Sequence, residues 1–538
     1  MNLAPEPYHF PDHERSATMK RRHLIQAVPA ALGMTIAGVP LHSLAQARKG
    51  IVNVLVQPEP PGLMMGIVQN GPTQLIAGNI YEGLLRYDEK LQPQPQLATS
   101  WTVSPDSKTY VFKLKPNVKW HDGKPFTADD VVFSCDVFLR KTHARFRASL
   151  AHVETIKALD PLTVEFKLKQ PFGPFLGIFE NGTMPMVPRH IYEGTDFLNN
   201  PANATPIGTG PLKFKEWAKG SYIHLVANEN YHQAGVVTIE SVYFHVIPDA
   251  ASRAAAFESG KVDIAPGGTV EYFDVNRLSK LPGAAVTTKG WEFFAPQSWL
   301  WINNRTKPMD QVKFRQAIWT AIDREAMAKI AWYGFAKPAT GPFNSHIAYA
   351  SDDVAKYPRD IAKAKKLLAE AGYKGETLRL LPLPYGESWQ RQAEIVRQNL
   401  TQAGVKIEMV ATDVAGWNQR CNEWDFDLAF TYVYQYGDPA LGVGRNYTSS
   451  NIAKGSPFNN VAGYSNPKVD ALFAAGATES DPTKRRAIYL EVQKILVDEV
   501  PVAWLHEINF PTLYRTKVQN IVSSGIGLND SLGRVKLA

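Results

Sequence analysis

The chain has 538 residues, with 58 Lys and Arg against 51 Asp and Glu, which gives a formal net charge of +7. This excess is small for the length and the basic residues are scattered, so we interpret them as a solvated surface and exclude a nucleic-acid-binding module. A chain of this length is too long for one core, so we expect two or three lobes.

The N-terminal residues have the features of an export signal. A Lys-Arg-Arg run at residues 20–22 precedes a mainly apolar stretch at residues 24–44, and residues 45–47 have the small-x-small form of a signal-peptidase site. We predict a signal peptide over residues 1–47, with Met19 as an alternative start. The paired arginines suit a twin-arginine signal, and an ordinary Sec signal also fits. No cysteine stands at the cleavage site, and no later segment resembles a membrane span, so we expect a soluble periplasmic protein without a lipid anchor.

Residues 97–134 read LATSWTVSPDSKTYVFKLKPNVKWHDGKPFTADDVVFS. Tyr110, Phe112 and Leu114 alternate with Val111, Lys113 and Lys115, which predicts a half-buried strand. Thr127 with Asp130 three residues later resembles a capping box and predicts a helix through the apolar residues that follow. The segment contains no nucleophile, phosphate loop or metal-ligand spacing.

The next segments mix strands and turns. Residues 153–168 predict two strands around an Asp-Pro turn, and residues 171–188, which are rich in Pro, Gly and Phe, predict a loop. The sequence PIGTGP at residues 206–211 suits a tight turn before two strands. A phosphate-binding loop would require a helix directly after the glycines, and none is indicated. Residues 242–264 predict a strand, a turn, a helix and a short strand.

From residue 297 the pattern changes to alternating helices and strands. Apolar residues at helical spacing predict one long helix within residues 310–334. Further helices are predicted at residues 361–371, 387–403 and 482–499, and strands at residues 378–381, 405–409 and 425–433. This βαβ order predicts a mostly parallel sheet covered by helices on both faces.

The chain has only two cysteines, Cys135 and Cys421, with no metal or redox spacing between them. An exported protein can form a disulfide, but we favour two separate buried thiols over a bridge. Single histidines such as His224 and His245 lie on strand patterns without carboxylate or cysteine neighbours, so we interpret them as structural or surface residues rather than metal ligands.

Three of these segments resemble the family 5 extracellular solute-binding proteins, the peptide- and nickel-binding subunits of ABC importers. The resemblance rests on residues 97–134, on PIGTGPLKFKEW at residues 206–217 and on KFRQAIWTAIDREAM at residues 313–327. It extends over about residues 50–510.

The resemblance implies an α/β fold, namely a two-lobed periplasmic binding protein of the type II-like, large cluster C form with an inserted subdomain and a hinge. By analogy, lobe I is expected to comprise residues 48–90, 206–296 and 504–538, the insert residues 91–205 and lobe II residues 297–503. The ligand is expected between the two lobes, which close on it and present the closed form to a membrane permease and its ATPases.

In the peptide binders of this family, an aspartate shortly after a Gly-Trp pair binds the free α-amino group of the peptide. In this chain Tyr432 and Val433 stand where Gly-Trp is usual, and Gln435 or Tyr436 falls near the position of the aspartate. Asp438 either takes over that role or shapes an Asp-Pro turn, and both interpretations stay open.

Aromatic and charged residues around this segment are the candidates for ligand binding. Aromatic faces suit planar or amphipathic ligands, although about half of these rings are expected to pack in the core. Arg445 can bind a ligand carboxylate, and Glu59, in a Pro-rich loop after the first strand, can bind a cationic group. The full set is Glu59, Trp291, Trp299, Trp417, Tyr434, Gln435, Tyr436, Asp438 and Arg445.

These features predict a monomeric periplasmic binding protein that carries a peptide or a peptide-like small organic solute, without a cofactor or catalytic residues. A non-peptide solute, such as an opine, a sugar-like molecule or a metal chelate, is the alternative within the same family. The scattered histidines argue against direct metal ligation. A periplasmic hydrolase is a third hypothesis, but neither Gly-x-Ser-x-Gly nor His-Glu-x-x-His occurs in the sequence.

Overall fold

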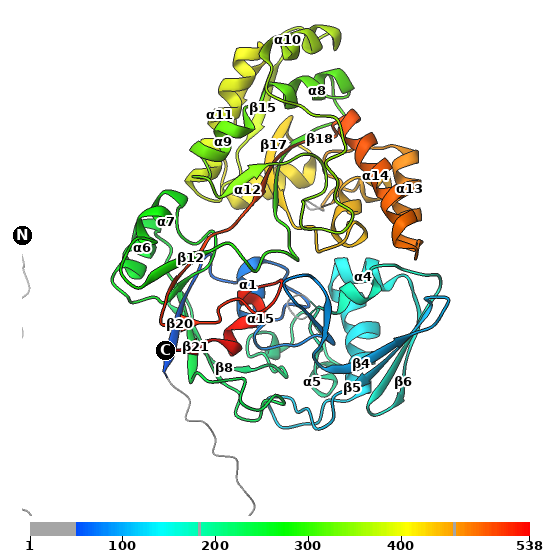
Figure 1. Ribbon diagram of the computed structural model, residues 1–538, viewed down its shortest axis with the longest axis vertical. Helices are drawn as coiled ribbons and strands as arrows, with labels where there is room; N and C mark the ends of the chain where they lie inside the picture. The colour runs from blue at the N-terminus through cyan, green and yellow to red at the C-terminus, as the bar shows by residue number, and fades with distance from the viewer. Residues whose placement is uncertain (1–49, 181–183, 456–458) are drawn as a thin grey trace, which may run out of the picture. The chain divides into compact units, whose positions relative to one another are not determined.

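The computed structural model describes residues 50–180, 184–455 and 459–538. Its larger sheets have seven, six and four strands. We call the seven-stranded sheet with its helices lobe I, the four-stranded sheet with its helices the insert, and the six-stranded sheet with its helices lobe II (Figure 1). The predicted signal peptide, residues 1–47, lies outside the described residues.

Lobe I is built around the apolar strand β1, which runs parallel to both of its neighbours, β10 and β11. The outer strands add antiparallel pairs, in the order β12-β19-β11-β1-β10-β9-β8. These strands are β1 (Ile51–Val56), β8 (Leu212–Ala218), β9 (Tyr222–Ala227), β10 (Ser241–Val246), β11 (Ile264–Ala265), β12 (Ala284–Thr287) and β19 (Thr512–Arg515). The helices are α1 (Gly71–Ala77), α6 (Ala250–Glu258), α7 (Tyr272–Leu278), α15 (Leu528–Ser531) and η7 (Leu532–Arg534). Two short ribbons complete it, β2 (Leu85–Tyr87) with β3 (Pro93–Pro95) and β20 (Val518–Gln519) with β21 (Lys536–Leu537).

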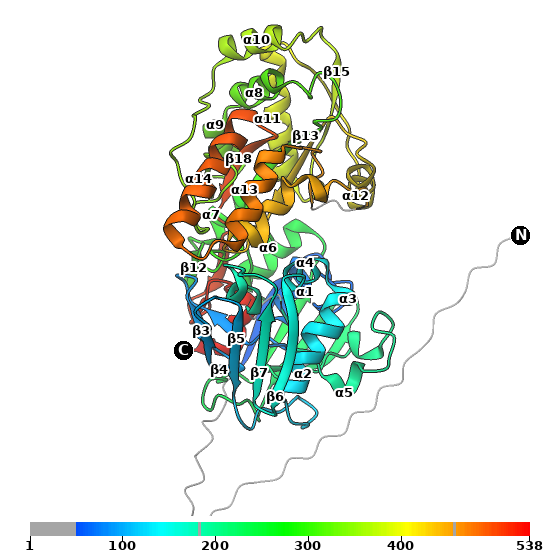
Figure 2. The ribbon, with the colours of Figure 1, turned by 90° about the vertical axis from the view of Figure 1, so that its right-hand side faces the viewer.

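The insert is an antiparallel sheet, and Figure 2 shows its strands β4, β5, β7 and β6 side by side, with α2 next to β6. The predicted capping box is present at the start of α2, where the carboxylate of Asp130 accepts the N–H of Thr127 at 2.9 Å. The strands are β4 (Ala98–Val103), β5 (Thr109–Leu114), β6 (Val153–Asp160) and β7 (Thr163–Leu168). The helices are α2 (Ala128–Val132), η1 (Phe133–Leu139), α3 (Arg140–Thr142), α4 (Ala144–Leu150), η2 (Phe175–Phe179), α5 (Arg189–Tyr192) and η3 (Pro201–Asn203).

Lobe II has the strand order β14-β18-β13-β17-β15-β16, and Figure 1 shows α9 and α11 on one side of its strands and α13 and α14 on the other. The strands are β13 (Gln297–Ile302), β14 (Ala336–Pro338), β15 (Thr377–Leu381), β16 (Lys406–Met409), β17 (Leu428–Val433) and β18 (Val502–Ile508). The helices are α8 (Val312–Ala321), α9 (Arg324–Ile330), α10 (Ile361–Glu370), α11 (Glu387–Ala403), α12 (Val414–Glu423), α13 (Pro467–Thr478) and α14 (Pro482–Glu499), with the short turns η4 (Pro439–Val443), η5 (Gly444–Asn446) and η6 (Ser449–Asn451).

The structure corrects three expectations for lobe II. The sheet is mixed rather than mostly parallel, because β15 pairs in parallel with β16 and β17, whereas the pairs β13–β17, β13–β18 and β14–β18 are antiparallel. The single long helix is two helices, because the carboxylate of Asp323 accepts the N–H of Ala326 at 2.9 Å and starts α9 anew. Residues 504–508 were expected in lobe I, but they lie in β18, a wholly buried strand between β13 and β14.

The two cysteines occupy separate hydrophobic cores. Cys135 lies in the core shared by lobe I and the insert, and Cys421 lies in the core of lobe II. Both are free and buried, so the prediction of two separate thiols is confirmed. Burial raises the pKa of both thiols, that of Cys421 to about 12. Among the residues that the structure describes, no helix is long and apolar enough to cross a membrane.

Candidate functional site

The segment that follows β17 carries most of the predicted ligand residues and is tightly turned. Tyr436 has a φ of +53° and Gly437 a φ of +71°, so the chain leaves the extended conformation at these two residues. The N–H of Gln435 donates to the carbonyl of Phe294 at 2.7 Å, and the carbonyl of Gly437 accepts the N–H of Ala348 at 3.0 Å. These bonds hold the rings of the segment in defined directions.

Gln435 is a buried structural residue. Its side-chain oxygen accepts the N–H of Asn344 at 2.8 Å. Its side-chain nitrogen donates to Gln297 Oε1 at 3.0 Å and to the carbonyl of Pro342 at 2.9 Å. Both donor hydrogens of the amide are therefore used inside the protein, and the side chain is fully buried. Gln435 offers nothing to a ligand in this arrangement.

Asp438 is held by a buried arginine. Its two carboxylate oxygens accept from Nη1 and Nη2 of Arg485, each at 2.8 Å, and Oδ1 also caps the N–H of Ala440. Burial acts to lower the pKa of Arg485, but the charge of Asp438 outweighs it and the pKa is raised. Of the two interpretations of Asp438, the geometry favours the turn-shaping one, because both of its oxygens are already occupied.

Two arginines from distant parts of the chain converge on the ring of Tyr436. The guanidinium carbon of Arg145, on α4 of the insert, lies 4.3 Å from the ring centroid. The guanidinium carbon of Arg445, on η5 of lobe II, lies 5.7 Å from the same centroid. Arg445 Nε is buried and has no hydrogen-bond partner among the described residues. Figures 1 and 2 show α4 on the side of the insert that faces α13.

Two further side chains, His143 and Glu180, belong to the same group. We call the five residues the arginine cluster: Arg145, Arg445, Tyr436, His143 and Glu180. His143 is only 2% exposed. Burial, with the charges of Arg145 and Arg445, holds the pKa of His143 well below its usual value, so the imidazole is neutral near pH 7. Burial lowers the pKa of Arg145, and Arg445 lowers it further, whereas Tyr436 and Glu180 oppose this change.

An aromatic group lies beside the arginine cluster. Tyr434 is half-buried, and its ring centroid is 6.4 Å from that of Trp291, 5.1 Å from that of Phe294 and 6.3 Å from that of Tyr436. Burial, with the neighbouring Tyr432, raises the pKa of Tyr434 well above its usual value, so the phenol is neutral and can donate a hydrogen bond. The structure thus places Trp291, Tyr434, Tyr436 and Arg445, four of the candidate residues of the sequence analysis, near one another.

Three predicted site residues lie elsewhere. Trp299 and Trp417 are in the core of lobe II, where Trp299 donates to Gln297 and Trp417 stacks on Trp301 at 5.8 Å. Glu59 accepts from Trp217 Nε1 at 2.7 Å and from the N–H of Gly220 at 2.9 Å. It therefore ties the loop after β1 to the β8–β9 turn.

The sequence analysis missed Arg145, His143 and Glu180. A signal was present, because residues 140–147 (RKTHARFR) are dense in basic side chains. Two of these fold back on their own segment, since Arg140 binds Asp136 and Arg147 binds the carbonyls of residues 140 and 141. Only the structure shows that Arg145 instead reaches lobe II.

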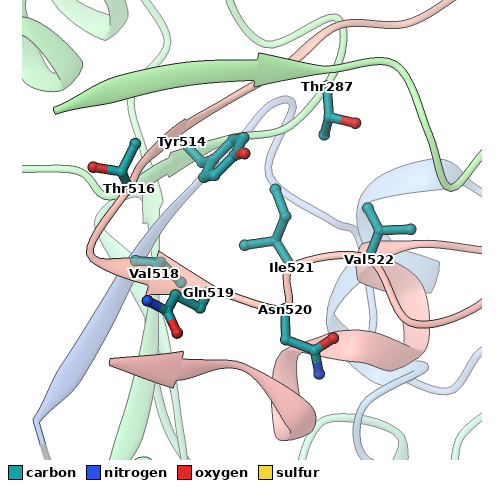
Figure 3. Close-up of a pocket in the computed structure, with 8 residues that line it drawn as sticks. All are labelled: Thr287, Tyr514, Thr516, Val518, Gln519, Asn520, Ile521 and Val522. Atoms are coloured by element: carbon teal, nitrogen blue, oxygen red, sulfur yellow. The ribbon is translucent and has the colours of Figure 1, made fainter. Parts of the chain in front are cut away.

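A separate pocket of about 380 Å³ opens on lobe I, away from the arginine cluster. Figure 3 shows its lining, which comes from β12, β19, β20 and the following loop and contains no charged side chain: Thr287, Tyr514, Thr516, Val518, Gln519, Asn520, Ile521 and Val522. Within the described ranges, no group of three or more His, Cys, Asp or Glu side chains is placed to hold a metal ion.

Comparison with known proteins places the chain in a family. Residues 92–454 match the model of the family "Bacterial extracellular solute-binding proteins, family 5 Middle". The glutathione-binding protein GsiB of Salmonella typhimurium is 30% identical over 453 residues, which cover 80% of this chain and 83% of that protein. GsiB of Escherichia coli K12 is 28% identical over 456 residues with the same coverage.

Solved structures agree with this assignment. DppA from Helicobacter pylori, in complex with the peptide STSA, superposes with a TM-score of 0.81 at 25% identity, covering 91% of this chain and 98% of that chain. AgaA from A. tumefaciens R10, in complex with agropinic acid, gives a TM-score of 0.79 at 25% identity, covering 91% and 99%. The two-lobed fold, the insert and the sequence match lead to one conclusion: the chain belongs to the family 5 extracellular solute-binding proteins, the solute-capturing subunits of ABC importers.

Proposed function

We propose that this chain captures a peptide or a peptide-like small organic solute between its lobes and delivers it to the permease and ATPases of an ABC importer. It acts as a soluble monomer in the periplasm, reached through a Tat or Sec signal, and it performs no catalysis. The relatives that bind glutathione and the peptide STSA support this substrate class.

The arginine cluster is the observation that carries the proposal. Arg145 of the insert packs on Tyr436 of lobe II, so one group of side chains spans two separately built parts of the molecule. A solute that binds to both sides favours the state in which they are together, and this differential affinity is what drives closure in a two-lobed binding protein.

One observation favours a second candidate, an acidic solute that is not a peptide. Gln435 carries no charge, and the carboxylate of Asp438 is occupied by Arg485. Neither residue is available to bind the α-amino group of a peptide, and burying that ammonium group without a partner is costly. The agropinic acid complex of AgaA supports such a ligand class.

Native mass spectrometry of the protein, purified from periplasm without denaturation, tests the proposal. We expect a mass excess that is lost on unfolding and that identifies the solute. A ladder of peptide masses supports the first candidate, and a single non-peptide acid supports the second. A protein that carries no solute, and that no peptide or organic acid stabilises in a thermal-shift screen, would refute both.

A further inference from the structure

We infer that the arginine cluster anchors the solute through an anionic group, a carboxylate or its chemical equivalent, rather than through an amine. Arg445 and Arg145 supply the positive charge, His143 supplies a neutral polar contact and Tyr436 forms the floor. This inference rests on the proposed function and deepens it, because it specifies the charge of the ligand.

The first step is the position of the two arginines. Both guanidinium groups lie near the same aromatic ring, and both belong to partly buried side chains. Like charges that are held close together and away from bulk water repel each other. The ring of Tyr436 offsets part of this repulsion through cation–π contact, but an anion placed between the guanidinium groups offsets it more completely.

The second step is the balance of charge around the ring. Arg145 and Arg445 each carry one positive charge, and Glu180 is the carboxylate that acts on Arg145. His143 is neutral, and Asp438 is neutralised by Arg485. The cluster therefore retains an excess of one positive charge, which matches a ligand with one anionic group at this point.

The third step is the set of unused hydrogen-bonding atoms. Arg445 Nε and His143 Nδ1 are both buried and have no hydrogen-bond partner among the residues that the structure describes. Buried polar atoms are almost always paired in proteins, so two unpaired ones in the same arginine cluster, where the charge of Arg445 acts on His143, indicate that a partner is supplied from outside the chain. A carboxylate can accept from the arginine and, in the matching tautomer, from the imidazole.

The amine alternative fails on the same charges. An ammonium group at this position would add a third positive charge, and the carboxylate of Asp438 is already bound to Arg485 at 2.8 Å. Glu180 is the only acidic member of the cluster, and it already acts on Arg145. The chemistry therefore selects the acidic end of a solute.

The experiment uses matched probes and matched variants of the full mature protein. The probes are reduced glutathione, N-acetyl-glutathione, in which the amine is blocked, and glutathione diethyl ester, in which the acids are blocked. Trialanine, N-acetyl-trialanine and trialanine methyl ester form a second set. The solute that the protein retains from periplasm is identified by mass and titrated by calorimetry beside them.

The variants are Arg445→Met and Arg145→Met, with Arg445→Lys to retain the charge. Arg486→Met is the control. Arg486 neighbours Arg485 in sequence and is exposed, so its replacement by Met removes the same charge outside the cluster. Thermal unfolding confirms that each variant folds.

We expect the retained solute to be an acid, and the protein to bind amine-blocked probes and to lose binding of acid-blocked ones. Each Met variant should bind the acid about 10- to 100-fold more weakly, the effect of one lost charge-assisted hydrogen bond, with partial recovery in Arg445→Lys. Arg486→Met should bind like the wild type.

Two results separate the possible failures. If the wild type binds an acid-blocked probe as well as the free acid, or if both Met variants bind like the wild type, the inference is wrong while the proposed function stands. A retained solute without an acidic group would also overturn the inference. If the wild type retains no solute, binds no probe and is stabilised by no peptide or organic acid in the thermal-shift screen, the proposed function fails and the inference fails with it.

Discussion

The pairing of Asp438 with Arg485 predicts that Asp438 maintains the fold rather than binding the ligand. The side chains are only 12% and 6% exposed, respectively, and two N···O distances of 2.8 Å make the pair bidentate. Asp438→Asn retains the cap on Ala440, because an amide oxygen can accept the same N–H. It removes the negative charge and the acceptor for Nη1 of Arg485, which leaves Arg485 buried without a counter-ion.

Breaking one side of a buried ion pair costs about 3–5 kcal/mol, because the remaining charge stays out of water. We therefore expect Asp438→Asn to lower the free energy of unfolding of the ligand-free protein by about 3 kcal/mol. Urea titration followed by tryptophan fluorescence measures this change. Asp481→Asn is the control, because Asp481 caps α14 at the surface and forms no ion pair in the described structure. We expect a change within about 0.5 kcal/mol for the control.

The double variant Asp438→Asn with Arg485→Met removes the uncompensated charge as well. We expect it to be more stable than the sum of the two single changes predicts, by about 1–3 kcal/mol. A loss below about 1 kcal/mol in Asp438→Asn, together with weakened solute binding, would refute the reasoning. Asp438 would then be a ligand residue, and Arg485 would not depend on it.

Three further predictions concern buried polar groups. Gln435→Glu should lower the free energy of unfolding by about 3 kcal/mol, because it buries a charge and removes donors from two acceptors, whereas exposed Gln402→Glu should change it little. Burial holds the pKa of His506 at about 4, so the stability that its neutral form contributes is present above about pH 6.5 and is lost towards pH 4. In urea titrations, the free energy of unfolding of His506→Asn should therefore fall by about 3 kcal/mol less than that of the wild type between pH 6.5 and pH 4. Neither Cys135 nor Cys421 should react with a thiol reagent until the protein unfolds, as intact mass will show.

Each of these has a result that would contradict it. A stable Gln435→Glu protein would mean that the amide network is not needed. Equal pH dependence in wild type and His506→Asn would mean that folding does not change the pKa of His506. Labelling of the folded protein at one thiol would show that its core opens.

The helices of lobe II were predicted best where capping residues, proline or glycine mark their ends. Helix α11 ends before Gly404, whose φ is +97°, and α14 begins after the cap Asp481 with proline at its first position. Such signals are local, so they can be recognised without knowing the fold. The break between α8 and α9 has a local signal too, Asp323, but it lies inside an apolar pattern that continues through it.

The candidate site was predictable only where its residues are close in sequence. Tyr434 and Tyr436 follow one strand, and both stood among the candidate ligand residues around that segment. Arg145 was missed because its partner lies in another lobe, and a contact between distant segments leaves no periodic trace in the sequence. Trp299 and Trp417 were overestimated for the related reason that an aromatic ring in a core and one in a binding site look alike in composition.

The residue at position 435 determines whether this segment can attract the amine of a ligand. A carboxylate there would receive the N–H of Asn344 but would face two acceptors, Gln297 Oε1 and the Pro342 carbonyl, so it would be stable only with a cation beside it. An amide satisfies all three neighbours without a ligand. Once the position is neutral, the excess charge at the contact between insert and lobe II is set by Arg145 and Arg445. The single polar substitution and the two arginines therefore act in the same direction, since one removes the attraction for an amine and the others create the attraction for an acid.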